Sequence, residues 1–161
     1  MHITSETKKH ADMHYINTAA EIACKSPCFR SRCGTIIVKN NAIIGTGYNA
    51  PPQDNKIDKC LKDSLPEHFK SDKTCCIHAE QRAIMDALIH FPQEITGARL
   101  YFIRLDEQGN KLYAGEPYCT ICSKMALDSG IVEFVLWRKN GLYVYDTKEY
   151  NELSFQYRTE E

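Results

Sequence analysis

The apolar residues near the beginning of the chain recur at steps of three and four residues, which is the spacing of one face of an α-helix. They are Met13, Ile16, Ala19, Ala20 and Ala23. The pattern predicts an amphipathic helix from about residue 9 to residue 25. This helix should end before Pro27, because a proline disfavours helical backbone in the residue that precedes it.

Two runs rich in β-forming residues follow, at residues 35–38 and 42–48. The residues between them, Lys39-Asn40-Asn41, suit a tight turn because asparagine tolerates a positive φ. The sequence therefore predicts an antiparallel hairpin here.

The stretch from residue 49 to residue 76 is polar, has no sustained hydrophobic period and is interrupted by Pro51, Pro52 and Pro66. A segment of this length without regular structure is uncommon as a simple connection inside a compact domain. We expect it to line a binding pocket.

Helices and strands alternate in the second half of the chain. Helical spacing after His78 predicts a helix of about fourteen residues that ends near Phe91, and the same spacing after Cys122 predicts a second helix capped by Gly130. The other expected elements are strands at residues 98–104, 131–137 and 142–145, the second of them buried on both faces, and a weakly helical tail at residues 147–158.

This order of elements predicts an α/β fold, with a mixed sheet of five strands and helices on both of its faces. The chain has 161 residues and no break in composition, so we expect residues 1–161 to form a single domain.

Charge and composition narrow the classes of partner. The formal net charge is -1, and no run of Lys and Arg is long enough to follow a phosphate backbone, so we expect no nucleic acid polymer as partner. The N-terminus lacks the apolar core of a signal peptide and no apolar run approaches membrane-spanning length, so we expect no membrane contact and a cytoplasmic location. In that compartment the eight cysteines stay reduced and are available for metal binding or burial.

Four residues in two short segments have the composition of a catalytic zinc site. His78, Cys119 and Cys122 supply three nitrogen and sulfur ligands of the kind zinc prefers, and Glu80 is a nearby carboxylate not needed as a ligand. Cys119 and Cys122 are three residues apart at a helix start and so share a face. Helix N-termini favour thiolates over thiols.

Three other interpretations remain open. Cys75 or Cys76 as a fourth ligand would make a closed structural zinc site, which leaves no place for water. Cys119 and Cys122 also fit a redox pair, but that interpretation leaves His78 and Glu80 unexplained. An acidic residue in a first helical turn is common in its own right.

The pattern His-x-Glu followed by Pro and Cys-x-x-Cys resembles the signature of the zinc-dependent nucleobase deaminases. A second resemblance lies upstream, where Cys28–Val38 and Ile43–Asn49 are similar to the strand-turn-strand segment of the deoxycytidylate deaminases. Together the two resemblances cover roughly residues 11–138. The chain is identified as a member of the cytidine and deoxycytidylate deaminase superfamily, closest to the deoxycytidylate branch.

The resemblance implies a three-layer, cytidine-deaminase-like fold and assigns roles to single residues. His78, Cys119 and Cys122 would hold Zn2+, whose fourth position is left for water, and Glu80 would move protons between that water and the substrate. Asn49 and Ala79 would contact the substrate, although Asn49 is equally well placed as a turn cap and Ala79 for helix packing. The family also implies a homo-oligomer.

Three further features depart from this pattern or add to it. Tyr118 intervenes between Pro117 and Cys119, where the common family pattern has proline directly before the first cysteine. Cys28, Cys60, His68 and Cys75 are candidates for a second, structural zinc site that pins the long polar segment, as in some deoxycytidylate deaminases, with plain burial as the alternative. Arg30 and Arg32 are candidates for contact with a 5′-phosphate.

The expected activity is hydrolytic deamination of a small cytosine nucleotide, dCMP to dUMP with release of ammonia. The alternatives are a deaminase of free cytidine, deoxycytidine, cytosine or another amino-heterocycle, and a zinc-stabilised binding module without catalysis. The intact Glu80 argues against the last of these, and the balanced charge argues against tRNA as substrate.

Overall fold

The computed structural model describes residues 1–28, 30–66 and 75–157. Its four helices, as far as these residues extend, are α1 (Glu6–Ala23), α2 (Ala79–His90), α3 (Thr120–Asp128) and α4 (Thr147–Gln156). The strands are β1 (His2–Ile3), β2 (Arg32–Lys39), β3 (Ala42–Tyr48), β4 (Arg99–Leu105), β5 (Lys111–Leu112), β6 (Glu133–Arg138) and β7 (Gly141–Asp146). Two short 3₁₀ segments, Pro52–Asp54 and Leu61–Ser64, lie in the long polar segment.

All these strands belong to one mixed sheet in the order β1-β7-β6-β4-β2-β3, with β5 paired to β4. The β4–β6 pair is parallel and every other pair is antiparallel. The five expected strands are the five long ones, so the predicted α/β fold is confirmed. The predicted count of five is too low by two, because β1 and β5 have two residues each and are too short to show an alternating pattern.

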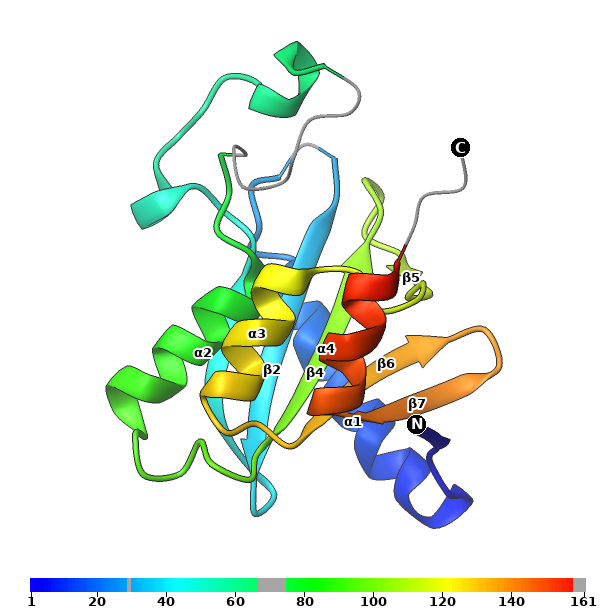
Figure 1. Ribbon diagram of the computed structural model, residues 1–161. Coiled ribbons are helices and arrows are strands. Elements are labelled where there is room, and N and C mark those ends of the chain that lie inside the picture. Colours follow the sequence, from blue (N-terminus) through cyan, green and yellow to red (C-terminus); the bar gives the residue numbers. More distant parts are fainter. Residues whose placement is uncertain (29, 67–74, 158–161) are drawn as a thin grey trace.

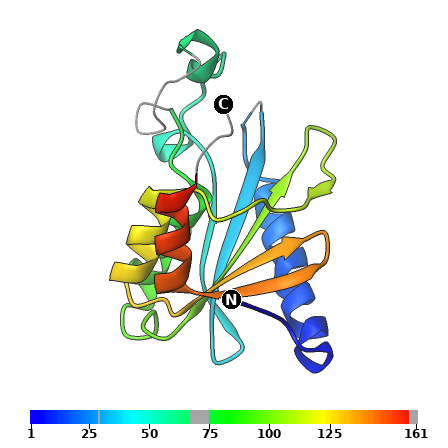
Figure 2. The ribbon, with the colours of Figure 1, turned by 45° about the vertical axis from the view of Figure 1, so that its right-hand side comes forward.

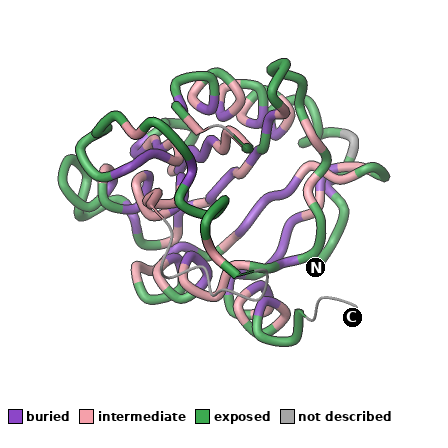
Figure 3. Tube along the Cα trace, turned by 90° about the horizontal axis from the view of Figure 1, so that it is seen from above, coloured by how far each residue is buried: buried purple, intermediate pink, exposed green. Residues whose placement is uncertain are grey.

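The sheet lies between two layers of helices (Figures 1 and 2). Helix α1 covers one face, while α2, α3 and α4 lie side by side on the other. Alternate residues of a strand point to opposite faces of the sheet and so belong to two hydrophobic cores. In β2, Ile36 packs in the core under α1, and Ile37 packs in the core on the side of α2, α3 and α4. Viewed from above, the strands between the helix layers are mostly buried, and the outward turns of the helices are exposed (Figure 3).

Glycines let two helices approach the sheet closely. A Cβ added at Gly47 of β3 would lie 2.2 Å from the carbonyl oxygen of Ala79, and one added at Gly34 of β2 would lie 2.1 Å from that of Ala19. Neither position has room for a side chain. Gly47 therefore fixes how near the N-terminus of α2 lies to the sheet, and this helix start carries the candidate metal ligand His78.

The local turn predictions are confirmed. Asn40 and Asn41 both have positive φ, 49° and 64°, in the turn between β2 and β3. Gly130, with φ 85°, follows the end of α3. Helix α2 has 12 residues instead of the fourteen expected, since His78 is its N-cap and Phe91 its C-cap, and neither is part of the helix.

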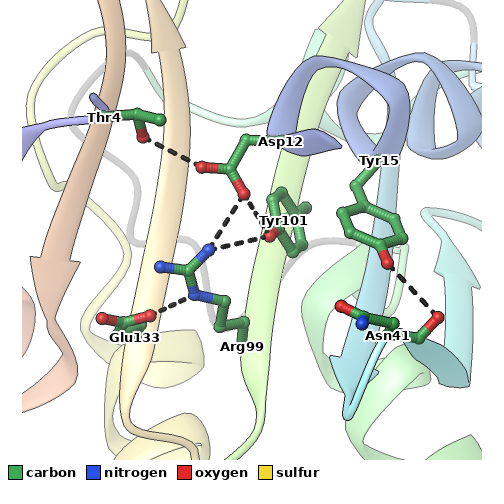
Figure 4. A network of polar contacts seen from close by, with 7 residues as sticks. All are labelled: Thr4, Asp12, Tyr15, Asn41, Arg99, Tyr101 and Glu133. Carbon is green, nitrogen blue, oxygen red and sulfur yellow. Dashed lines mark hydrogen bonds and ion pairs between the residues drawn. The ribbon is translucent and has the colours of Figure 1, made fainter. Parts of the chain in front are cut away.

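A polar network on the α1 face joins four elements (Figure 4). Asp12 of α1 accepts hydrogen bonds from the Thr4 hydroxyl at 3.0 Å, the Tyr101 hydroxyl at 2.7 Å and Nη1 of Arg99 at 2.9 Å. Arg99 also forms an ion pair with Glu133 of β6. The network ties the N-terminal segment, α1, β4 and β6 together.

Among the described residues, none of the helices combines the length and the apolar character needed to cross a membrane.

Candidate metal centre and pocket

The candidate metal ligands converge because two helices begin at the same place. His78 is the N-cap of α2, Cys119 is the N-cap of α3, and Cys122 lies in the first turn of α3. A short antiparallel bridge between Ala50 and Ile77 holds the chain just before α2 beside the end of β3. The two helix starts therefore meet on the three-helix side of the sheet, as the sequence predicted.

The three ligand atoms are close enough to share one ion. Nδ1 of His78 lies 3.2 Å from Sγ of Cys122 and 3.3 Å from Sγ of Cys119, and the two sulfur atoms are 3.3 Å apart. Zinc binds sulfur at about 2.3 Å and nitrogen at about 2.0 Å, so two ligands of one ion must lie within about 4.6 Å of each other. Within the described part of the chain, no other group of three or more His, Cys, Asp and Glu side chains is this compact.

The electrostatics of the centre also suit a cation. The pKa of Cys119 falls to about 4, first because it accepts a hydrogen bond from Cys122 and then because His78 lies beside it. Cys119 in turn raises the pKa of His78, with which it forms a hydrogen bond. It also raises the pKa of Cys122, because the Cys122 thiol donates its hydrogen to Cys119. Without metal, the two cysteines and the imidazole thus share protons through hydrogen bonds. A divalent cation that binds these three side chains displaces the protons.

Glu80 lies beside this centre in the first turn of α2. Its side chain is only 7% exposed and interacts with the thiol of Cys122. Burial raises the pKa of the carboxyl group above its usual range. A carboxyl group in this setting is suited to exchange protons with a bound reactant.

A pocket with a volume of about 510 Å³ opens over the centre. Its wall includes His78, Ala79, Glu80 and Cys119 together with side chains from the long polar segment, β4 and α4. The volume is within the range of small-molecule sites. The expectation that residues 49–76 contribute to a pocket is met by the described residues Asn49, Cys60, Lys62, Cys75 and Cys76.

The two residues expected to contact substrate both line this pocket. Ala79 is fully buried at the first position of α2. Asn49 is engaged within the protein: its Oδ1 accepts from the Ser26 hydroxyl and the Cys33 amide, both at 2.7 Å, and its Nδ2 donates to the Ser31 carbonyl at 2.9 Å. Asn49 thus fixes the entry to β2, and its side chain also hydrogen-bonds with Cys28 at the pocket wall.

Tyr118 lies at the pocket wall with its side chain 59% exposed. Its ring packs edge-on against Tyr157 at the end of α4, with centroids 4.8 Å apart. The extra residue before Cys119 leaves the metal centre compact, because Cys119 still caps α3.

The candidate second zinc site is only partly covered by the described residues. Cys28, Cys60 and Cys75 all line the pocket, whereas His68 lies outside the described residues. Cys28 is paired with Cys76, which was not in the predicted set, and this contact lowers the pKa of Cys28 to about 5. All eight cysteines are free thiols.

The two arginines considered for phosphate contact differ in position. Arg30 lines the pocket but forms an ion pair with Asp63, and Arg32 donates to the carbonyl oxygens of Asp106 and Glu107. Arg104 of β4 lines the pocket, and in the described part of the chain no ion pair involves it. Sequence reasoning missed Arg104 and also Tyr150 of α4, which lines the pocket from the far end of the chain.

The fold and the centre together define a protein of the zinc-binding deaminase class. The chain belongs to the family described as "Cytidine and deoxycytidylate deaminase zinc-binding region", whose profile matches residues 9–137. The resemblance drawn from the sequence is therefore confirmed, and zinc is the metal that the His78, Cys119 and Cys122 group fits.

Curated relatives carry the name deoxycytidylate deaminase. The one from Mycobacterium phage D29 is 30% identical over 132 residues, which are 77% of this chain and 91% of that protein. The one from Saccharomyces cerevisiae is 29% identical over 129 residues, again 77% of this chain. The match spans only 36% of the length of the S. cerevisiae protein.

Solved structures share the fold. The dCMP deaminase of cyanophage S-TIM5, crystallised with dCMP and dUMP, is 25% identical with a TM-score of 0.54, covering 83% of this chain and 82% of that one. A cytidine deaminase from Burkholderia pseudomallei is 16% identical with a TM-score of 0.56, covering 86% and 94%. The latter similarity extends to the fold alone.

Proposed function

We propose that this protein is a zinc-dependent hydrolytic deaminase that converts dCMP and water into dUMP and ammonia. The observation that carries the proposal is the compact group of His78, Cys119 and Cys122 with the buried Glu80 beside it, at the wall of a pocket of about 510 Å³. Family membership and the names of the relatives from phage D29 and S. cerevisiae support it.

In this proposal the imidazole of His78 and the thiolates of Cys119 and Cys122 hold the zinc ion. The ion, when bound, supplies a Lewis acid that makes water acidic enough to attack at neutral pH. The three side chains come from two helix N-termini, where the helix dipoles favour the negative charge of the thiolates.

Glu80 moves the protons. It accepts a proton from the attacking water and delivers it to the ring nitrogen next to the amino-bearing carbon. It then takes the proton of the hydroxyl group now on that carbon and gives it to the amino group, so that the carbon–nitrogen bond breaks, ammonia leaves and the carbonyl of the product forms. Burial raises the pKa of this carboxyl group, which suits a group that must both accept and return a proton.

Ala79 and Asn49 contact the substrate. The fully buried Ala79 lets the pyrimidine ring approach the backbone at the start of α2. Asn49 meets the substrate from the pocket wall, and its hydrogen bonds within the protein hold its amide in one orientation.

A nucleotide is favoured over a nucleoside by the charge of the pocket wall. Arg104 and Lys62 both line the pocket, and in the described residues neither forms an ion pair. A 5′-phosphate is the part of dCMP that these cations would bind. A nucleoside or free base offers them no anion.

The protein works in the cytoplasm as a homo-oligomer, without nucleic acid as partner. The eight free thiols support a reducing compartment. Exposed apolar side chains on and just after α2, from Met85, Leu88, Ile89 and Phe91, support assembly with further copies of the chain. The net charge of -1 argues against a polyanionic partner.

The test is to incubate the zinc-loaded protein with dCMP, CMP, deoxycytidine, cytidine and cytosine while following the loss of cytosine absorbance. We expect turnover of dCMP with the highest kcat/KM. Turnover of the nucleosides but not of the monophosphates would contradict the nucleotide assignment. Binding without any turnover would favour a non-catalytic zinc-stabilised module.

The variant Arg104→Gln sharpens this test. We expect it to lower kcat/KM for dCMP by about 10-fold, the loss of one charge-assisted contact, and to leave deoxycytidine unaffected. Lys124→Gln, an exposed cation on α3 outside the pocket, is the control. Equal loss with both substrates would mean that Arg104 does not contact the phosphate.

A further inference from the structure

Tyr150 is a pocket residue to which the proposed mechanism gives no task. It belongs to α4 and lines the same pocket as Glu80 and Cys119, yet its side chain is only 6% exposed. Its ring stacks on Phe134 with centroids 3.9 Å apart and an interplanar angle of 9°. Tyr145 packs edge-on against it at 5.6 Å. Two aromatic neighbours therefore hold the ring in one orientation.

The helix that carries Tyr150 is itself fixed to the helix that carries the metal ligands. The hydroxyl of Ser123 in α3 donates to Oδ1 of Asn151 at 2.9 Å and lies 2.9 Å from the hydroxyl of Ser154. Ser123 and Ser154 are both buried. Figures 1 and 2 show α3 and α4 side by side over the sheet. The position of Tyr150 relative to Cys122 is thus set by hydrogen bonds between α3 and α4.

The ring of Tyr150 is buried, but its hydroxyl is open to the pocket: the oxygen is not one of the buried polar atoms without a partner in the described residues, and the residue lines the pocket wall. In the described part of the chain no hydrogen bond involves the Tyr150 hydroxyl, whereas Tyr145 accepts one from Arg138 and Tyr101 donates one to Asp12. The hydroxyl therefore keeps both its donor and its acceptor capacity.

The surroundings of this hydroxyl identify the end of the pocket to which it belongs. Tyr150, Glu80 and Cys119 all line this pocket, and α4 is bonded to the helix that carries Cys119. Burial raises the pKa of Tyr150, with further contributions from Glu80 and the two cysteines, so the phenol stays neutral. Glu80 and Tyr150 share this end of the pocket without a hydrogen bond to each other.

We propose that Tyr150 binds the reacting part of the substrate: its hydroxyl forms a hydrogen bond with the edge of the pyrimidine ring that carries the amino group. This inference rests on the proposed function, in which Glu80 serves the ring nitrogen beside the amino-bearing carbon. A group near Glu80 meets the same ring edge. A phenol can accept from the amino group of the substrate and donate to the oxygen that replaces it in the product.

The experiment compares Tyr150→Phe with Tyr145→Phe in the zinc-loaded protein. Both variants keep the aromatic ring, and the control removes a hydroxyl that lies against Arg138 instead of the pocket wall. Zinc content, thermal unfolding, kcat and KM with dCMP, and the dissociation constant of dUMP by calorimetry are measured for each. The binding measurement does not depend on turnover.

We expect Tyr150→Phe to keep its zinc and its melting temperature. Its kcat/KM should fall between about 5-fold and 100-fold, and dUMP should bind more weakly by a factor of similar size, because a buried polar group of the ligand loses its partner. Tyr145→Phe should leave both values within about twofold of the unchanged protein, since its hydroxyl lies outside the pocket.

The opposite results are equally clear. Unchanged kcat/KM and dUMP binding in Tyr150→Phe, or loss of zinc or of folding in that variant, would overturn the inference while dCMP turnover by the unchanged protein upheld the proposed function. An unchanged protein that neither deaminates dCMP nor binds dUMP would overturn both.

Discussion

The two faces of the sheet each carry a group of buried polar side chains, and the groups differ in what their polar atoms contact. On the α1 face, Asp12 accepts three hydrogen bonds, from Thr4, Arg99 and Tyr101, and Arg99 also pairs with Glu133 (Figure 4). Each of these groups is engaged by another protein group. Such a network stabilises and orients the elements it joins, and it offers little to a ligand.

On the three-helix face the polar groups lie at the wall of a pocket, where a ligand can reach them. The nitrogen of His78 and the sulfur atoms of Cys119 and Cys122 approach one another within 3.3 Å, and the Tyr150 hydroxyl has no partner in the described residues. Glu80 is buried among them at a pocket wall. Burial of polar groups alone does not mark a functional site, since both faces have it. The distinguishing property is the pocket: His78, Glu80, Cys119 and Tyr150 line it, so a metal ion or ligand can compete for their bonding capacity, whereas Asp12 and its partners do not line it.

The largest expected effect comes from removing a metal ligand. His78→Ala should lower zinc affinity by more than about 100-fold, because changing groups that merely support a ligand already costs 10- to 100-fold. Activity should fall to background with the zinc. The measurements are metal content by elemental analysis and turnover of dCMP.

His90→Ala is the matched control, because His90 lies at the other end of α2, is exposed and contacts Asp86. It should keep zinc and activity. Full zinc content in His78→Ala would contradict the assignment of this imidazole as a ligand.

The second-largest expected effect is on kcat, and it distinguishes a catalytic carboxyl group, Glu80, from a structural one, Glu133. Glu80→Gln should keep its zinc and lower kcat by about 10²- to 10⁴-fold, the range of general acid–base catalysis. Glu133→Gln, which weakens the ion pair with Arg99, should leave kcat unchanged. Steady-state kinetics and zinc analysis of both variants measure these two effects. A fully active Glu80→Gln protein would remove Glu80 from the mechanism.

The third effect belongs to the α1 face. Asp12→Ala leaves Arg99, Tyr101 and Thr4 without their shared acceptor, and we expect it to cost about 3 kcal/mol of unfolding free energy, at the low end for a broken buried ion pair. The low end applies because Arg99 is 23% exposed and keeps Glu133. The melting temperature should fall by about 6–12 °C.

Catalysis should be insensitive to this change. Below its melting temperature, Asp12→Ala should deaminate dCMP with the kcat/KM of the unchanged protein, because the network lies across the sheet from the pocket. A large loss of kcat/KM in a folded, zinc-loaded Asp12→Ala protein would show that the two faces are coupled.

The sequence predicted those parts of the site that depend on short spacing. His78 and Glu80 are two residues apart, Cys119 and Cys122 three apart, and each pair lies at a helix start that hydrophobic periodicity reveals. Their convergence on one ion was predicted from the ligand chemistry that zinc prefers and from the family resemblance. The turn between β2 and β3 was also predicted from the sequence, because its two asparagines adopt a positive φ at little cost.

The parts that were missed depend on packing between distant segments. Tyr150 lies in the tail that the sequence predicted as weakly helical, and nothing local connects it with Glu80. Arg104 alternates with buried neighbours in β4, and its place at the pocket depends on which face of the sheet it occupies. Asn49 was predicted either to cap a turn or to contact substrate, and its bonds to Cys33 and Ser31 depend on how the hairpin meets the end of α1.

The smallest expected effect is also the most direct test of the comparison, because it uses the same substitution on both faces. Tyr101→Phe removes a hydroxyl that donates to Asp12 at 2.7 Å, and it should cost about 1–2 kcal/mol of unfolding free energy in urea titrations. Tyr150→Phe removes a hydroxyl without a protein partner in the described residues, and it should change that free energy by less than about 0.5 kcal/mol. A loss in Tyr150→Phe as large as that in Tyr101→Phe would mean that the protein already uses the Tyr150 hydroxyl. Equal bonding of the two tyrosines would then leave the pocket without the unused group that distinguishes it from the α1 face.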